Sequence, residues 1–458
     1  MRKEKKMKVC KFGGSSVADA MQVNKIVDIV LSDPERKIVV VSAPGKRNKE
    51  DTKVTDMLIL CANEVLANKC HEKTLKAIVE RYAEIQRELK LAPGIVAEIE
   101  KDLRSRVKGD TSHQGMFMDC MKAAGEDNAA KIVAQAFQAR GAKAIYINPH
   151  EAGMFLTEDF GNAQLLEESY PLLKHTLSNR DELVIFPGFF GYTKKGQVAT
   201  FPRGGSDITG SILAAAVQAD VYENITDVDS VYPVDPRLVP EVKEGIKEMT
   251  YREMRELAYA GFGVFHDEAV IPAVKAGIPI NVRNTNRPSE PGTMIVKTRE
   301  AQTAGVVGIA SGDGFCNIFI DKYMMNREVG FGRKLLQILE EEGVSYEHMP
   351  SGIDNVSVVF RDRNFTAECE ARVRARIFKD LSPDNVQIER GYALVMVVGE
   401  GLYYTVGMAS KATNALAAAN VNIEMMNQGS SEISMMFGVK SADRVSAVKA
   451  LYQAFFGK

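Results

Sequence analysis

The sequence predicts an α/β protein, with strands and helices that alternate in its first part and two smaller α+β units at its end. Three observations predict it. β-branched runs such as residues 37–44 alternate with helical patterns up to about residue 300, as in a sheet covered by helices. Glycine-containing turns separate several of these elements. Beyond residue 300, one segment repeats another without a gap.

The composition fits a folded protein of several domains. The chain has 458 residues, of which 45% are hydrophobic and 26% charged, and its net charge is −2. A chain of this length usually forms two or three domains, and its balanced charge argues against nucleic acid as a partner. The cysteines form no C-x-x-C pair, and no apolar run is long enough to span a bilayer. We therefore expect a cytoplasmic protein with no membrane partner.

The first strand ends in a glycine turn. The apolar residues 8–12 are followed by Gly13-Gly14-Ser15-Ser16 and by a helical pattern at 17–31. A turn between a strand and a helix presents backbone N–H groups to an anion, so a phosphate site is one interpretation and a structural turn is the other. Lys11 favours the first, because an unpaired ammonium at the end of a buried strand would be costly.

Helices are predicted from Lys53 to about Arg140, with breaks at 93–94 and 109–115. Strands return at 144–147 and 182–186.

A further glycine turn, Arg203-Gly204-Gly205-Ser206-Asp207, opens an alanine-rich helix at 208–219. This turn brings together a cation, unhindered glycine backbone and a carboxylate. Taken separately, however, Asp207 would be explained as a helix N-cap and Arg203 as a surface residue.

Polar residues also follow the strand at 219–225, where ligands bind in open α/β sheets. Thr226-Asp227 comes first, and a proline turn at 234–237 comes next. The chain has no G-x-x-x-x-G-K-[ST] loop, no kinase H-R-D or D-F-G motif, and no G-x-G-x-x-G that opens a helix. A phosphate site here would therefore belong to a different phosphoryl-transfer fold.

The C-terminal part contains an internal repeat. Residues 317–360 align with 394–437 without a gap, and the matches fall at turn glycines and at core positions. Each copy predicts a strand, an amphipathic helix that starts near a glycine, a strand through Val344 or Val421, and a last strand. We expect two small β-α-β-β units.

The segment Lys11-Phe12-Gly13-Gly14-Ser15-Ser16-Val17-Ala18 resembles the opening signature of the aspartokinases, members of the amino-acid kinase family. The resemblance covers nearly the whole chain. Further matching segments follow in the expected order: Gly125-Glu126, Phe160-Gly161, Pro187-Gly188-Phe189, Arg203 to Asp207, Thr226-Asp227, Asp235-Pro236-Arg237 and 428–432. The resemblance implies a three-layer αβα sandwich kinase domain at 1–300 and two ferredoxin-like ACT domains, the first at 315–385 and the second formed by 301–314 and 386–458.

The resemblance implies that the γ-phosphoryl group of ATP, with Mg²⁺, is transferred to the β-carboxylate of L-aspartate. The product, 4-phospho-L-aspartate, opens the route to lysine, threonine and methionine. A carboxylate with a pKa of about 4 is already ionised at neutral pH and needs no general base. The site instead needs cations and backbone amides that neutralise the phosphoryl charge. The chain ends after the second repeat, so we expect a monofunctional enzyme without a dehydrogenase domain.

The resemblance also assigns residue roles. Lys11 would supply the main catalytic charge and Asp207 would hold it, while Arg203 would bind the α-carboxylate of aspartate and Glu126 its ammonium. The other substrate contacts would be Ser42, Thr55, Gly204, Gly205 and Ser206. The nucleotide contacts would be Lys11, Gly13, Gly14, Ser15, Thr226, Asp227, Tyr232, Asp235 and Arg237. No metal held by protein side chains alone is expected, and core packing is an equal interpretation of Tyr232.

Two segments depart from the family pattern. Where many relatives carry Gly-Ala-Lys-Val-Leu-His-Pro, this chain has residues 261–267, so Gly263 replaces a lysine that helps to hold ATP. Either another cation such as Arg237 compensates, or nucleotide binding is weaker. His266 is kept, and we interpret it as a packed residue, not as a catalyst. The loop 46–53 is longer than in many relatives, which makes Thr55 a less secure assignment.

The first repeat is the expected effector site, where loop amides would bind an α-carboxylate and Glu347 an ammonium. The expected residues are Met325, Glu328, Gly330, Ser345, Tyr346, Glu347, Asn355 and Val356. Lysine is the leading effector and threonine the next. ACT domains pair between subunits in the family, so a homo-oligomer is expected, either a dimer or a tetramer. The alternative is that both repeats serve only to dimerise.

Two other functions stay open. One is a kinase of the same fold that acts on glutamate, acetylglutamate or a nucleoside monophosphate. The other is an amino-acid sensor that kept the fold and lost catalysis, for which Gly263 is the only support. The tandem repeats and the turn at 203–207 favour aspartate. A degraded site would be expected to lose some of its residues, and this chain keeps Lys11, Glu126, Arg203 and Asp207.

Overall fold

The computed structural model describes residues 6–261, 267–299, 305–428 and 433–457. The chain divides into two compact units, the first comprising 1–231, 245–254 and 263–299, and the second 232–244, 255–262 and 300–458. The predicted kinase domain at 1–300 stays a prediction. The first compact unit differs from it mainly in 232–244 and 255–262, which belong to the second unit.

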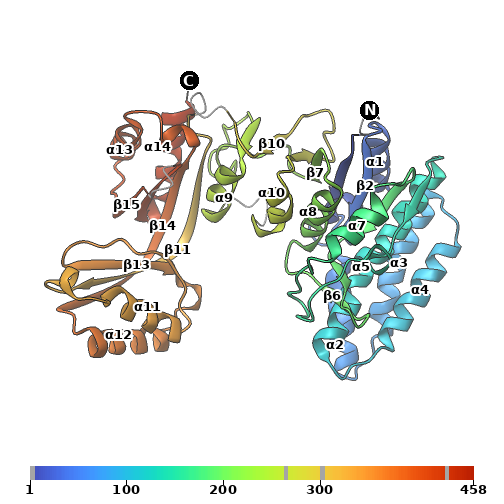
Figure 1. Cartoon of the computed structure of the whole chain (residues 1–458), viewed down its shortest axis with the longest axis horizontal. Helices are drawn as coiled ribbons and strands as arrows, with labels where there is room; N and C mark the ends of the chain where they lie inside the picture. Colours follow the sequence, from blue (N-terminus) through green and yellow to red (C-terminus); the bar gives the residue numbers. More distant parts are fainter. Residues whose placement is uncertain (1–5, 262–266, 300–304, 429–432, 458) are drawn as a thin grey trace. The chain divides into compact units, whose positions relative to one another are not determined.

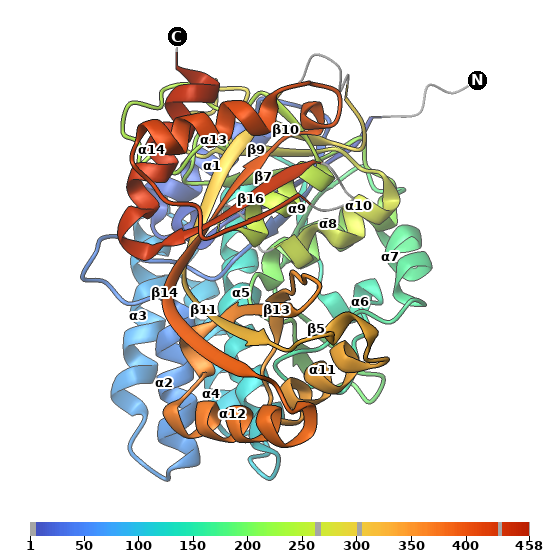
Figure 2. The same ribbon diagram turned by 90° about the vertical axis from the view of Figure 1, so that its left-hand side faces the viewer.

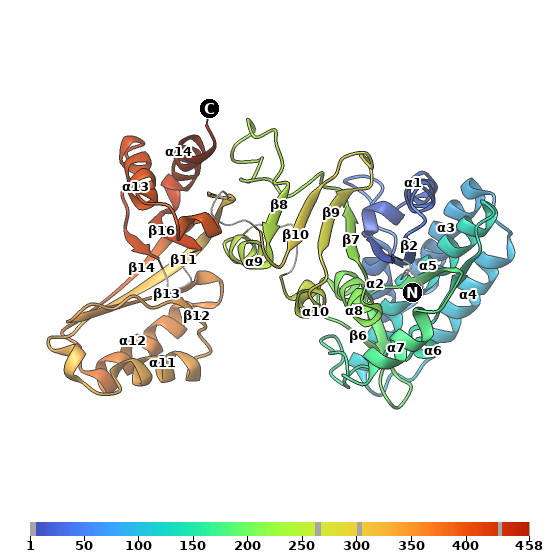
Figure 3. The same ribbon diagram turned by 45° about the horizontal axis from the view of Figure 1, so that its top comes forward.

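A mixed sheet forms the centre of the first unit. Within the described residues it has eight strands in the order β3-β4-β2-β1-β7-β9-β10-β8. They are β1 (Lys8–Phe12), β2 (Arg36–Val41), β3 (Ala144–Tyr146), β4 (Leu183–Pro187), β7 (Val221–Thr226), β8 (Glu248–Thr250), β9 (Ile280–Asn284) and β10 (Thr293–Val296). The strands from β3 to β9 are parallel, whereas β10 is antiparallel to β9. Figure 3 shows β7, β9, β10 and β8 side by side.

Helices cover both faces of this sheet (Figure 1). One face packs against α1 (Ala20–Leu31), α2 (Val54–Leu66), α3 (Glu72–Leu89), α4 (Gly94–Val107) and α5 (Gln114–Ala139). The other face carries α8 (Gly205–Val217), with α7 (Ser169–Leu177) and α10 (Ile271–Ala276) beside it. Cys10 and Phe12 point into the first layer, so the side chain between them, that of Lys11, points towards α8. This three-layer arrangement confirms the predicted fold class.

The remaining elements of the first unit are short. They are α6 (Pro149–Ala152) and a hairpin of β5 (Phe190–Tyr192) and β6 (Val198–Thr200). Helix α9 (Tyr251–Tyr259) begins in the first unit and ends in the second. Within the described part of the chain, no helix has the length and apolar character needed to cross a membrane.

The expectation that the first glycine turn leads directly into a long helix is wrong. A single 3₁₀ turn, η1 (Gly14–Val17), comes first, and α1 begins only at Ala20. The reason is Asp19, whose carboxylate caps α1 by accepting a hydrogen bond of 2.9 Å from the backbone N of Gln22.

The second unit contains one antiparallel sheet. Among the described residues it has six strands in the order β12-β13-β11-β14-β16-β15. They are β11 (Gly308–Asp321), β12 (Tyr346–His348), β13 (Asn355–Arg361), β14 (Asn385–Val398), β15 (Met425–Asn427) and β16 (Ser434–Lys440). The long strands β11 and β14 pair along their whole lengths (Figure 2).

Two separate cores lie on this sheet. One is built around α11 (Phe331–Glu341) and α12 (Ala367–Leu381), and the other around α13 (Met408–Ala418) and α14 (Arg444–Phe456). The β11 residues 308–312 pair with the end of β14 and contribute to the second core. The two predicted α+β units therefore share their long strands, in agreement with the predicted ferredoxin-like fold class.

The predicted strands through Val344 and Val421 are wrong in their position. Val344 follows Gly343, whose φ is +71°, and its N–H bonds back to the carbonyl of Leu339 at 2.8 Å. This is a helix-ending turn in which the apolar residue after the turn packs against the last helical residues. The second repeat has the same turn before Val421. The strands β12 and β15 begin only after these turns.

Candidate active site

Lys11, which is buried, and Asp207, which is partly exposed, form an ion pair in the first unit. The Lys11 side chain is 9% exposed, and its Nζ lies 2.6 Å from Asp207 Oδ1. Asp207 belongs to the first turn of α8, whose N-cap is Gly204, so its carboxylate is free to face the strand. The same oxygen accepts a hydrogen bond of 2.7 Å from Asn224, the β7 residue opposite Lys11. The structure thus brings together the two residues predicted to be catalytic.

The turn after β1 forms an open cradle beside this ammonium. A Cβ atom at Gly13 would lie 3.7 Å from Lys11 Nζ and 4.0 Å from Thr226 Oγ1. At Gly45 a Cβ would come within 2.6 Å of the Gly14 carbonyl carbon, because the turns after β1 and β2 touch through their backbones. The nearest atoms beside Gly13 are therefore the Lys11 ammonium and the Thr226 hydroxyl. These are partners that suit the phosphates of a nucleotide.

A cavity of about 470 Å³ lies next to this turn. Of the residues predicted from sequence it brings together Gly14, Ser15, Ser42, Thr55, Glu126 and Asp227. Sequence reasoning missed the others that line it, which are Ala43, Pro44, Gly45, Lys46 and Lys53. Both lysines lie in the loop between β2 and α2. Two cations in a loop beside a phosphate-type turn are the signal that could have found them.

Glu126 lies in the wall of this cavity on α5. Its neighbour Gly125 lets the helix approach the end of β2 closely, since a Cβ there would lie 2.7 Å from that of Ala43. Glu126 is 6% exposed, and its Oε2 has no hydrogen-bond partner among the described residues. Burial raises the pKa of this carboxyl to about 8, against the opposing effects of an Ala43 backbone hydrogen bond and the Lys122 charge. A buried carboxyl with an unused oxygen is complementary to an incoming cation such as an ammonium.

The turn of Arg203 packs against the loop after β4. A Cβ at Gly205 would lie 2.5 Å from the Phe189 ring, and one at Gly188 would lie 2.6 Å from Ser206 Oγ. Arg203 is exposed, with no hydrogen bond or ion pair to the described residues. The turn residues 203–206 do not line the cavity, so the structure places them beside Asp207 without joining them to Glu126.

The predicted nucleotide contacts are divided between the two units. Thr226 ends β7 in the first unit and Asp227 follows it, with the threonine hydroxyl 3.2 Å from the aspartate Oδ1. Tyr232 belongs to the second unit and packs against the core around α13 and α14. Arg237 is 86% exposed and pairs with Asp235 at 2.7 Å, also in the second unit. The shared role of these residues therefore stays a prediction.

Gly263 and His266, on which the expected departure from the family pattern rests, lie outside the described residues. Within the described ranges, no group of three or more His, Cys, Asp or Glu side chains is placed to hold a metal ion.

The predicted effector residues of the first repeat differ in which of their groups are accessible to a ligand. Met325 and Val356 belong to the hydrophobic core, and only their backbones could meet a ligand. Gly330 is the N-cap of α11 with φ +85°, and Asn355 is half-buried at the start of β13. Ser345 is exposed, as is Tyr346.

The two predicted effector carboxylates already have partners. Glu328 is bound by Lys322 at 2.5 Å and by Lys334 at 3.0 Å. Glu347 accepts a hydrogen bond from the hydroxyl of Tyr259 and lies 3.7 Å from Arg361 Nε. The ammonium of an effector at either position would have to displace a contact or share the carboxylate.

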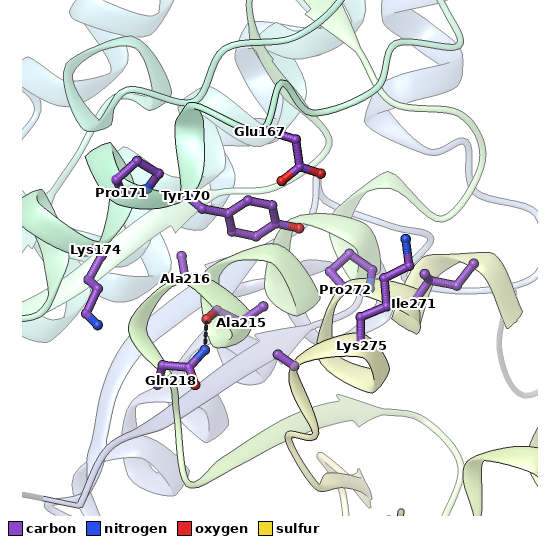
Figure 4. A pocket seen from close by; sticks show the side chains of 11 residues that line it. Glu167, Tyr170, Pro171, Lys174, Ala215, Ala216, Gln218, Ile271, Pro272 and Lys275 are labelled. Carbon is purple, nitrogen blue, oxygen red and sulfur yellow. Dashed lines mark hydrogen bonds between the residues drawn. The ribbon is translucent and has the colours of Figure 1, made fainter.

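A second cavity, of about 570 Å³, lies among α7, α8 and α10 (Figure 4). Its floor is formed by Ala215 and Ala216, and the Tyr170 ring lies across it. None of the predicted site residues lines it. No described side chain in its wall is both buried and without a hydrogen-bond partner, which distinguishes it from the cavity of Glu126.

Comparison with known proteins agrees with this geometry. A sequence profile described as the amino acid kinase family matches residues 6–284, and an ACT domain profile matches residues 395–455. The chain is 56% identical to aspartokinase 3 of Bacillus subtilis (strain 168), over 98% of this chain and 99% of that protein. The chain belongs to the aspartokinases. It is thus an aspartate kinase of the amino acid kinase family.

Solved structures of aspartate kinases share the fold along nearly the whole chain. The Clostridium acetobutylicum enzyme has a TM-score of 0.86 at 40% identity, covering 98% of this chain and 100% of that one. Aspartokinase III of E. coli in complex with aspartate and ADP has a TM-score of 0.75 at 25% identity, with coverages of 98% and 100%. The same enzyme in complex with lysine and aspartate has a TM-score of 0.76 at 26% identity, with coverages of 98% and 99%.

Proposed function

We propose that this protein transfers the γ-phosphoryl group of ATP to the β-carboxylate of L-aspartate, the first step towards lysine, threonine and methionine. The observation that carries the proposal is Glu126, whose buried and unpartnered oxygen lies in the same cavity wall as Gly14 and Ser15. An ammonium site next to a phosphate-type turn suits an amino acid that is to be phosphorylated. The complex of E. coli aspartokinase III with aspartate and ADP supports aspartate and an adenine nucleotide as the ligands of this site.

The chain supplies charge neutralisation and positioning. Lys11, held by Asp207, offers a fixed ammonium beside Gly13, and the backbone N–H groups of Gly14 and Ser15 offer further donors. Because the Lys11 ammonium is already oriented by Asp207, little reorganisation is needed as charge moves during the transfer. Mg²⁺, bound with the nucleotide phosphates, would supply additional positive charge.

Glu126 positions aspartate through its ammonium. Without substrate the raised pKa, about 8, leaves the carboxyl mostly protonated at neutral pH. An ammonium that binds to the free oxygen favours the ionised form, so aspartate binding at pH 7 releases a proton from this group. The β-carboxylate of aspartate, which is ionised in solution, needs no base to become the nucleophile.

The second unit is the proposed regulatory part. The first ACT domain, at 315–385, binds an end-product amino acid, with lysine preferred over threonine, while the second comprises 301–314 and 386–458. Binding of the effector ammonium replaces a contact of Glu328 or Glu347, both of which are engaged by side chains of the same unit. The complex of E. coli aspartokinase III with lysine and aspartate supports this choice of effector. ACT domains of neighbouring subunits pair, giving a cytoplasmic homo-oligomer.

The test is formation of aspartyl hydroxamate from MgATP, L-aspartate and hydroxylamine, with and without lysine or threonine. Lys11→Ala is expected to abolish the product, and the effector is the amino acid that suppresses it. Lys8→Ala is a matched control on the same strand, since Lys8 pairs with Asp33 at 2.7 Å and lies outside the cavity. ATP hydrolysis that does not depend on aspartate, together with calorimetric binding of an amino acid, would favour the sensor function instead.

A further inference from the structure

Two lysines of the loop between β2 and α2 line the cavity of Glu126, and none of the roles above uses them. Lys46 and Lys53 share the wall of this cavity with Gly14 and Ser15 of the first glycine turn. Both lysines are exposed, and neither side chain makes a hydrogen bond or an ion pair with the described residues. Their ammonium groups therefore have all their hydrogens available for a ligand in the cavity.

The base of this loop is joined to the glycine turn. The backbone N of Gly45 donates a hydrogen bond of 2.8 Å to the carbonyl of Gly14. The backbone N of Val54 donates one of 3.1 Å to the carbonyl of Pro44, which closes the loop on itself. The two lysines are the chain neighbours of these two donors. The backbone on which each lysine stands is therefore fixed at the edge of the cavity.

Ion pairs hold the middle of the loop. Asp51 is bound by Arg81 Nη1 at 2.7 Å and by Arg47 Nε at 3.0 Å. Arg81 comes from α3 and is 3% exposed, and its Nη2 donates a hydrogen bond of 2.6 Å to the carbonyl of Gly45. A loop that is already tied to a buried side chain loses little further entropy when it binds a ligand. The arginines of this segment have a carboxylate partner, whereas its cavity-lining lysines have none among the described residues.

The proposed transfer brings two anions together beside the glycine turn. An oxygen of the β-carboxylate bonds to the γ-phosphorus while the bond from that phosphorus to the oxygen shared with the β-phosphate breaks. That oxygen keeps the electron pair and leaves as part of ADP. Asp207 offsets part of the charge of Lys11, because their atoms lie only 2.6 Å apart. Among the described residues, the cations in the cavity wall itself are Lys46 and Lys53.

We propose that Lys46 and Lys53 bind the γ-phosphoryl group of ATP in this cavity, which makes the loop 46–53 part of the phosphoryl-transfer site. This inference rests on the proposed function of the site. A terminal phosphate carries more charge and more acceptor oxygens than a carboxylate, so it is the better partner for two lysines. ADP lacks this phosphate, and the two lysines should therefore distinguish ATP from ADP.

The test compares MgADP with a MgATP analogue in which an imido group bridges the β- and γ-phosphates, so that it is not hydrolysed. Calorimetry on the full chain gives the dissociation constant of each nucleotide. Lys46→Met and Lys53→Met are each expected to weaken binding of the analogue about tenfold, which corresponds to the loss of one hydrogen bond between charged groups. Binding of ADP should change less than about twofold. Lys46→Arg and Lys53→Arg keep the charge and should retain most of the affinity for the analogue.

Lys49→Met is the matched control. Lys49 is an exposed residue of the same loop and does not line the cavity, so its loss should leave both dissociation constants unchanged. Unchanged binding of the analogue in both methionine variants, or equal weakening of both nucleotides, would overturn the inference. A loss confined to the binding of aspartate would also overturn it. A wild-type protein that forms no aspartyl hydroxamate would instead overturn the proposed function.

Discussion

Two buried glutamates of the first unit have opposite surroundings. Glu223 on β7 is bound by Arg36 Nε at 2.6 Å, by Arg283 at 3.2 Å and by the Cys10 thiol at 3.1 Å. Burial alone would raise its pKa, but the hydrogen bond and charge of Arg36 outweigh burial and lower it. Glu126 has an oxygen without a partner, and burial raises its pKa to about 8. A buried carboxylate whose oxygens all have partners stabilises the fold. One that keeps an oxygen without a partner can bind a cation from outside.

The largest effect that this comparison predicts is on stability. Glu223→Gln leaves the guanidinium of Arg36, a residue that is 6% exposed, without its counter-charge. Removal of one partner from a buried pair costs about 3–5 kcal/mol, so the free energy of unfolding should fall by that amount. Denaturant unfolding followed by circular dichroism measures it.

Glu84→Gln is the control for this prediction, because Glu84 and Arg47 form an exposed pair at 2.5 Å. Such a pair is worth at most about 1 kcal/mol. If the free energy of unfolding fell by the same small amount in both variants, the Glu223 ion pair would not stabilise the fold, and the prediction would be wrong.

Glu126→Gln is expected to act mainly on catalysis. The amide keeps the shape of the side chain and cannot supply a negative charge to the substrate ammonium. We expect kcat/KM for aspartate to fall about 100-fold, which is about 2.7 kcal/mol of lost transition-state binding, while the KM for ATP changes little. Steady-state kinetics of hydroxamate formation checks this. An unchanged kcat/KM, with the fold intact, would remove Glu126 from the substrate site.

The sequence alone predicts part of this contrast. The strand, the glycine turn and Lys11 are adjacent in the chain, so a local pattern is enough to suggest an anion site. Glu126 was found through the family resemblance, since its burial depends on Gly125 meeting Ala43, a contact between distant segments that no local pattern encodes. Nothing in the sequence indicated Glu223, because its partners come from three other strands or strand ends.

The errors in the second unit also arise because residue type along the chain does not show the backbone conformation at a turn. Val344 and Val421 fit a strand by residue type. However, the residue before each of them has a positive φ and ends the preceding helix, so both valines lie in a helix-ending turn. The layered fold was predictable because alternation of strands and helices is a repeated pattern along the chain.

The smallest expected effect is a pH dependence that distinguishes the two glutamates. The pKa of Glu126 is raised from an ordinary value of 4.5 in the unfolded chain to about 8 in the folded one. Its contribution to stability is therefore complete below pH 4.5 and is lost as pH rises to about 8, because the folded state must then ionise a buried and unpaired group. Between pH 6 and pH 8 this loss amounts to about 2 kcal/mol, taking about 1.4 kcal/mol for each pKa unit.

Glu126→Gln cannot ionise, so its stability relative to the wild type should increase across the range from pH 6 to pH 8. Thermal unfolding of both proteins in matched buffers gives the difference in Tm at each pH. Saturating aspartate should diminish the difference, since the ammonium pairs with the ionised wild-type carboxyl and stabilises the folded state. A difference in Tm that is constant with pH would mean that Glu126 is ionised throughout and already has a partner, like Glu223, and the contrast between the two glutamates would disappear.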